Sequence, residues 1–230
     1  MLNKLRDLLV LLAPHVIAYF QNRPSKAKAV PGARITWSLT VVVMDGTDLE
    51  EKARIPVSEA VEFIEARTRF TFNVRYIETD VAHDVTPYPS DMVRYAMLGW
   101  NIPDSFIRSL PVSTTYLFLY KLGGLEAAQA GSSLGIDHGL MIGGKPRVYA
   151  TAPTDQRWFI NVPNQGFRSW AAQILTHEII NTIQGTVEAP PFNCGQLTGT
   201  PGIRSDLHEA ERLTKLTDAC YKKVAESLDH

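Results

Sequence analysis

Excess charge, cysteine and long apolar runs are all scarce in this chain of 230 residues. Its 23 basic and 24 acidic residues leave a formal net charge of -1. Because no basic excess is present to neutralise phosphates, we expect no nucleic-acid partner. The two cysteines, Cys194 and Cys220, could form a disulfide in an exported protein or serve as small apolar residues in a cytosolic one. With 45% hydrophobic residues, the chain can still bury a core.

The N-terminal residues 1–22 hold the longest apolar stretch, LLVLLAPHVIAYF, after the charged start MLNKLRD. Ala27 and Ala29 then form a loose A-x-A pattern, as in a secretory signal. The stretch is too short and too broken to predict a spanning helix, and an amphipathic helix or membrane-surface anchor fits it as well. The sequence therefore leaves open export or membrane association on one side and a soluble N-terminal helix on the other, with membrane contact limited to residues 1–22.

A helix is predicted over Gly166–Gly185, GFRSWAAQILTHEIINTIQG, with Gly185 as its terminating residue. His177 and Asn181 are four residues apart and share one face, while Glu178 lies about 100° round the helix. A histidine is a metal ligand and a neighbouring glutamate can act as a general base. This helix is the candidate site. An unrelated H-E dipeptide on a surface helix remains the plain alternative.

The preceding chain predicts a mixture of strands and helices. Strands are expected at Thr36–Met44, Phe70–Tyr76, Thr114–Tyr120, Gly139–Gly144, Arg147–Ala152 and Trp158–Val162, from alternating or continuous apolar residues. One helix is expected to begin at Ser58 as its N-cap, and two short helices are expected over Asp91–Leu98 and Asp104–Leu110. A last helix is expected from Ser205 or Asp206 to about Leu228. Gly123–Gly135 is predicted to be a loop.

This order of elements, ending in a helix with His177 and Glu178, resembles the N-terminal subdomain of the zincin metallopeptidases, and of the metzincins in particular. The resemblance covers about Thr36–Glu188 and implies an α+β fold with a mixed twisted sheet. It places the sheet-and-helix subdomain at residues 33–188, preceded by residues 1–32 as an N-terminal helix or a signal- or anchor-like segment plus linker, and followed by 189–230 as an irregular loop and C-terminal helix that pack back. It also implies a Gly-rich edge strand that binds extended substrate, here Gly139, Leu140, Met141, Ile142, Gly143 and Gly144.

The zincin motif H-E-x-x-H has Asn181 where its second histidine belongs. Two hypotheses follow from the resemblance. In the first, the protein is a zinc-dependent hydrolase that acts as a peptidase on polypeptide, with Glu178 as general base and His177, Asn181 and Glu188 as metal ligands. In the second, it is an inactive zincin-like protein that uses the cleft and the edge strand to bind a peptide or protein. Asn181 separates the two, because an amide oxygen is a poor zinc ligand.

Overall fold

A computed structural model describes residues 30–81, 103–121, 132–134, 140–154, 169–194, 213 and 216–228. The predicted helix over Asp91–Leu98, the predicted strand over Trp158–Val162 and the N-terminal stretch of residues 1–22 lie outside these residues. In the part of the chain that is described, no helix is long and apolar enough to cross a membrane.

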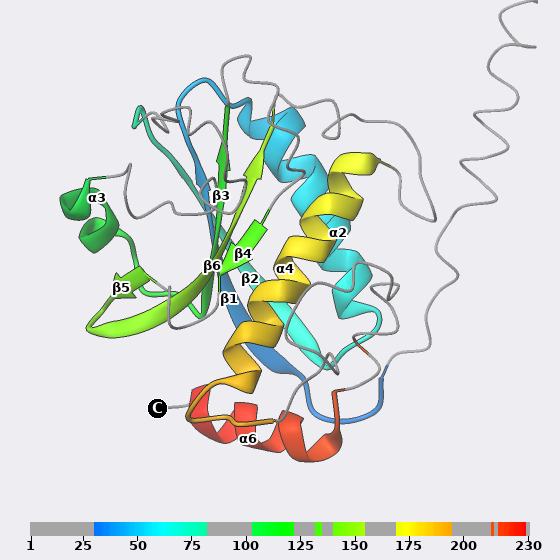
Figure 1. Cartoon of the computed structure of the whole chain (residues 1–230). Coiled ribbons are helices and arrows are strands. Elements are labelled where there is room, and N and C mark those ends of the chain that lie inside the picture. The colour runs from blue at the N-terminus through cyan, green and yellow to red at the C-terminus, as the bar shows by residue number, and fades with distance from the viewer. Residues whose placement is uncertain are drawn as a thin grey trace, which may run out of the picture.

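A mostly parallel sheet forms the centre of the molecule (Figure 1). Its strand order is β2 (Phe70–Glu78), β1 (Ile35–Val43), β3 (Thr115–Tyr120), β6 (Lys145–Pro153) and β4 (Ser132–Leu134). The first four strands are mutually parallel, whereas β4 is antiparallel to β6. A further strand, β5 (Leu140–Ile142), forms an antiparallel hairpin with β6. The predicted mixed sheet is confirmed.

Helices cover the two faces of the sheet unequally. Helices α2 (Ile55–Glu65) and α4 (Trp170–Glu188) pack together on one face, and the short α3 (Asp104–Ser109) lies on the other (Figure 1). The crossover from β1 through α2 to the parallel strand β2 forms a βαβ unit.

Alternation along β1 explains why two cores form. Trp37, Leu39 and Val41 face the larger core under α2 and α4, while Val42 and Met44 face the smaller core. The smaller core lies on the α3 face and also contains Ile107, Leu110, Tyr116, Phe118, Tyr120, Leu140, Ile142 and Tyr149. The strand β3 is buried along its whole length, as its continuous apolar sequence predicted.

The helix after β1 begins earlier than predicted. Asp48 is the N-cap and accepts a hydrogen bond from the Glu51 amide at 2.6 Å. A π-helical segment, η1 (Leu49–Arg54), then leads directly into α2, so Ser58 lies inside a helix and caps nothing. Pro56 near the start of α2 has no N–H to donate and crowds the preceding turn, which fits the wider π-helical turn before it.

The last helix was also predicted incorrectly. Leu216 and Thr217 are not helical, and α6 covers only Asp218–Leu228, so one unbroken helix from Ser205 or Asp206 is excluded. The predicted start of this helix, up to residue 212, lies outside the described residues. α6 packs beside the N-terminal end of β1, as Figure 1 shows.

Two sets of contacts hold α6 in place. Cys220 forms a disulfide with Cys194, with the two Cα atoms 5.2 Å apart, which is the first of the two roles considered for these cysteines. On its other side, Tyr221 accepts a hydrogen bond from the Arg69 amide at 3.4 Å, and Arg69 also pairs with Asp218. Burial raises the pKa of Tyr221. The end of the chain is thus fixed both to the residues after α4 and to the start of β2.

Candidate functional site

The helix α4 is fixed firmly against the sheet. Ser169 caps it by accepting a hydrogen bond from the Ala172 amide at 3.0 Å. Beneath it, β6 presents the small residues Ala150 and Ala152, which allow α4 to lie close to the strand. The buried hydroxyl of Thr176 donates to the Ala172 carbonyl, so its burial leaves no unpaired polar group.

The outer face of α4 is a polar stripe. Its five residues are polar, only partly exposed, and spaced four, four, three and four apart, which places them on one side of the helix opposite the core. They are Gln173, His177, Asn181, Gln184 and Glu188. This polar stripe confirms that His177 and Asn181 share one face and that His177 is not packed inside the core.

Glu178 lies beside the polar stripe and is buried, with only 4% of its surface exposed. The Asn181 side-chain amide donates to its carboxylate, with Nδ2 and Oε2 3.5 Å apart. A carboxylate withdrawn from water needs such donors, because an unpaired buried charge is very costly. Asn181 therefore contacts the neighbouring glutamate through its amide nitrogen, which cannot ligate a metal.

Glu188 does not complete a metal site with His177. The helix was predicted to end at Gly185, before Glu188. Instead α4 continues through Gly185 to Glu188, and Gly185 does not have the positive φ of a terminating glycine. Eleven helical residues correspond to about 16 Å along the helix axis, too far for one ion to bind both side chains.

The described residues therefore do not fit a zinc site. A protein zinc site takes three or four ligands from cysteine, histidine, aspartate and glutamate. Within the described ranges, no three such side chains come together. His177 and Asn181 offer one imidazole and one amide, and the amide nitrogen is directed at Glu178.

The segment predicted as the substrate-binding edge has a different position. Leu140 and Ile142 pack in the smaller core with α3, on the face opposite α4. Gly143 and Gly144 have φ values of 62° and 73° and form the two-residue turn between β5 and β6. The strand that packs against α4 at the edge of the sheet is β4. It lies in the stretch predicted to be a loop, so that prediction was wrong for Ser132–Leu134.

Two short sequence patterns occur in this same region. Residues 131–135 spell G-S-S-L-G, which fits the G-x-S-x-G pattern of a nucleophile elbow, and Gly139–Lys145 fits G-x-x-x-x-G-K. An elbow needs its serine at a sharp turn from a strand to a helix. Ser133 is instead the middle residue of β4, opposite Ala150. Residues 140–145 of the second pattern form a β-hairpin, and Pro146 follows in place of serine or threonine, so neither pattern has the structural context of its motif.

A signal for β4 was difficult to find in the sequence. The strand has three residues, two of them serines, and no alternation distinguishes it from its glycine-rich surroundings. Its pairing with the much longer β6 defines it, and such non-local pairing is invisible in a local pattern. Comparison of the sequence with protein-family models finds no matching family, and comparison with curated proteins finds no matching sequence.

Proposed function

We propose that this chain is a zincin-like protein that binds an extended polypeptide along β4, beside the polar stripe of α4. The observation that supports this most strongly is the arrangement of the antiparallel edge strand β4 next to β6, followed in the chain by the helix with His177 and Glu178. In the metzincin-like arrangement, an antiparallel edge strand next to the helix with H-E binds extended substrate. Here that role moves from Gly139–Gly144 to Ser132–Leu134.

Strand addition suits this edge on physical grounds. Among the described strands, β4 is the last in the sheet order, and one side of a terminal strand offers backbone N–H and C=O groups to an incoming strand. The bound peptide would lie near α4, whose polar stripe provides the imidazole of His177 and the amides of Asn181 and Gln184. These groups both donate and accept hydrogen bonds, which suits the alternating polar groups of a peptide backbone.

The proposal is tested with peptides selected from a random library on the purified full-length chain. Each selected peptide is then resynthesised with one backbone nitrogen methylated at a time. Strand addition predicts that methylation weakens binding at every second position, because alternate N–H groups point toward β4. Equal sensitivity at all positions, or none at any, would refute strand addition.

A second pair of variants tests the contribution of α4. His177→Ala and Gln184→Ala alter the polar stripe without removing buried apolar contacts, so the fold should survive. Lys121→Ala is the control, because Lys121 is exposed, directly follows β3 and belongs to neither β4 nor α4. We expect weaker peptide binding for the first two variants and unchanged binding for the third.

The second candidate function is a metal-dependent hydrolase, favoured by the adjacency of His177 and Glu178 on α4, the first described helix after β6 in the chain. It would need ligands from outside the described residues, since those present do not fit zinc. Elemental analysis of the purified protein after mild dialysis tests it: a stoichiometric metal ion supports the hydrolase, and a metal-free chain that still binds peptide supports the binding protein.

The disulfide between Cys194 and Cys220 supports the expectation of export, because such bonds persist in oxidising compartments. A peptide ligand would then be met outside the cytosol. Thiol titration of the protein isolated from its own cells tests this, with two free thiols as the result that would contradict export.

A further inference from the structure

The hairpin between β5 and β6 ends in an exposed tip with unusual composition. Residues Met141–Pro146 form this hairpin tip, and all except Ile142 are exposed. Met141 is 58% exposed, and the nearby Val112 is 60% exposed. A Cβ placed on Gly143 would come within 2.8 Å of a Val112 methyl group, so the valine lies directly against the turn. In the described chain these two are among only three large apolar side chains with such exposure.

Basic side chains accompany the apolar ones. Lys145 lies in the hairpin tip and Arg147 follows two residues later on β6. Arg108 is exposed on α3, which packs against β5. The hairpin contains no acidic residue, and α3 contains one, Asp104, at its first position. Apolar side chains flanked by positive charge are the combination that binds the interface of an anionic bilayer.

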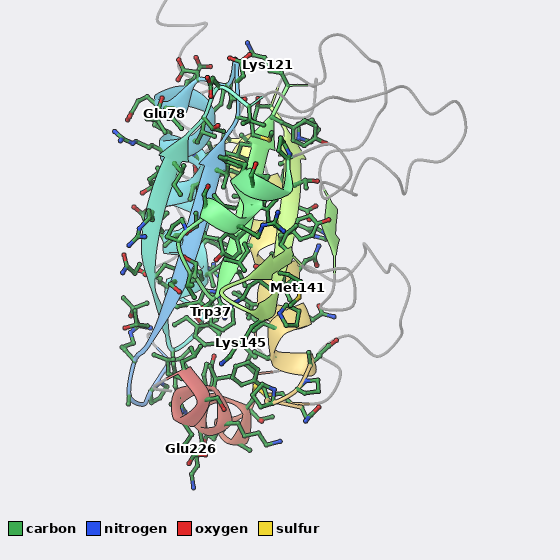
Figure 2. The ribbon with its side chains drawn as sticks, turned by 90° about the vertical axis from the view of Figure 1, so that its left-hand side faces the viewer. Trp37, Glu78, Lys121, Met141, Lys145 and Glu226 are labelled. Carbon is green, nitrogen blue, oxygen red and sulfur yellow. A yellow bond between two sulfur atoms is a disulfide. The ribbon has the colours of Figure 1, made fainter. Side chains whose placement is uncertain are left out.

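The hairpin tip also lies at the end of the sheet where the described chain begins. Leu39 of β1 and Val148 of β6 are both in register with Thr115, so Thr36 and Lys145 lie at the same level along the sheet. Figure 2 shows Met141 and Lys145 toward the same end as Trp37 and Glu226, away from Lys121 and Glu78. Residues 1–29, which precede this end, contain the apolar stretch and five basic residues, Lys4, Arg6, Arg23, Lys26 and Lys28, against the single acidic Asp7.

We propose that the hairpin tip is a second membrane contact, which touches the surface of an anionic phospholipid bilayer when residues 1–22 are bound there. Between Phe20 and Ile35 the chain has fourteen residues, which reach at most about 50 Å. Tethering over so short a distance raises the effective concentration of the hairpin tip at the bilayer. A contact of few residues, too weak to bind alone, therefore becomes occupied.

The test places a fluorophore at the hairpin tip of the full-length chain. The native cysteines are joined in a disulfide, so Met141→Cys provides a single reactive thiol for an environment-sensitive dye. Ile55→Cys is the matched control, because Ile55 is similarly exposed at 54% but lies at the start of α2. On vesicles of phosphatidylcholine with phosphatidylserine, we expect a blue shift at position 141 and none at position 55.

Three results with these anionic vesicles would overturn the proposal. In the first, the chain does not sediment with the vesicles. In the second, it sediments but the dye at position 141 shows no blue shift. In the third, the dyes at positions 141 and 55 shift equally. A shift of the same size on vesicles of phosphatidylcholine alone would also overturn it, since the proposed surface is anionic.

Charge variants give an independent measurement. Lys145→Ala should lower the vesicle partition coefficient about fivefold, the effect expected for one basic side chain near an anionic surface. Lys121→Ala removes a positive charge that is also exposed, at the other end of the molecule, and should have a much smaller effect. Equal losses for the two variants would mean that only the total charge matters and would contradict a specific contact.

Discussion

Removal of the disulfide between Cys194 and Cys220 should destabilise the protein strongly. The bond closes a segment of 26 residues, and loop-closure entropy for that length corresponds to about 3.5 kcal/mol at room temperature. The variant to use is Cys194→Ser with Cys220→Ala. Alanine is chosen at position 220 because that side chain is only 3% exposed, and a serine hydroxyl there would be buried.

Urea unfolding of the oxidised parent and the double variant measures this effect. The variant should unfold at lower urea with a steeper dependence, because its unfolded state is no longer held compact. The parent under reducing conditions is the control and should match the variant. A loss below about 1 kcal/mol would refute the argument, since it would mean that the loop is already ordered without the bond.

Three further predictions concern the site, the pH dependence and a helix cap. Asn181→His places a second imidazole one turn from His177 and should tighten zinc binding clearly in a titration; unchanged affinity would show that this face cannot hold the ion. Burial raises the pKa of Tyr76 to about 12, so the stability that comes from keeping its phenol neutral is present below pH 10 and is lost as the pH rises toward 12. Unfolding curves across this range should show the decline, and Tyr76→Phe should reduce it; an identical slope in the variant would contradict the assignment. Asp48→Ala removes the cap on the Glu51 amide and should cost about 1 kcal/mol in thermal unfolding, whereas Asp48→Asn should retain most of it.

Much of the sheet could be predicted because its strands are buried or alternate strongly. Trp37, Leu39 and Val41 recur at every second position and face the larger core, as the period of two requires. The continuous apolar sequence of Thr115–Tyr120 likewise matches a strand buried on both faces. In both cases the side chains that define the pattern are the ones that form the core.

The errors lie where backbone geometry or distant pairing decides the structure. Ser58 was a chemically reasonable cap, but a π-helical turn before Pro56 extends the helix back to Asp48. Gly185 is tolerated inside α4 because the adjacent Thr186 and Val187 are buried and hold that turn against the core. Tertiary packing thus outweighs the weak helix propensity of glycine.

The candidate site was predicted in part. Helical spacing alone was enough to place His177 and Asn181 on one face, since a regular helix leaves no freedom there. It could not show that Asn181 donates to a buried Glu178, which depends on side-chain rotamers and burial. Nor could it reveal β4, whose structure depends on residues 149–151 of a strand further along the chain.

Hydrogen exchange of the backbone amides, measured with and without a saturating selected peptide, tests the central claim most directly. Binding along β4 predicts slower exchange in Ser132–Leu134 and along the polar stripe of α4, because bound backbone and excluded water protect these amides. The β5–β6 turn at Gly143 and Gly144 should exchange at its original rate. Protection confined to that turn or to α6, with no change in β4, would contradict the proposed peptide site.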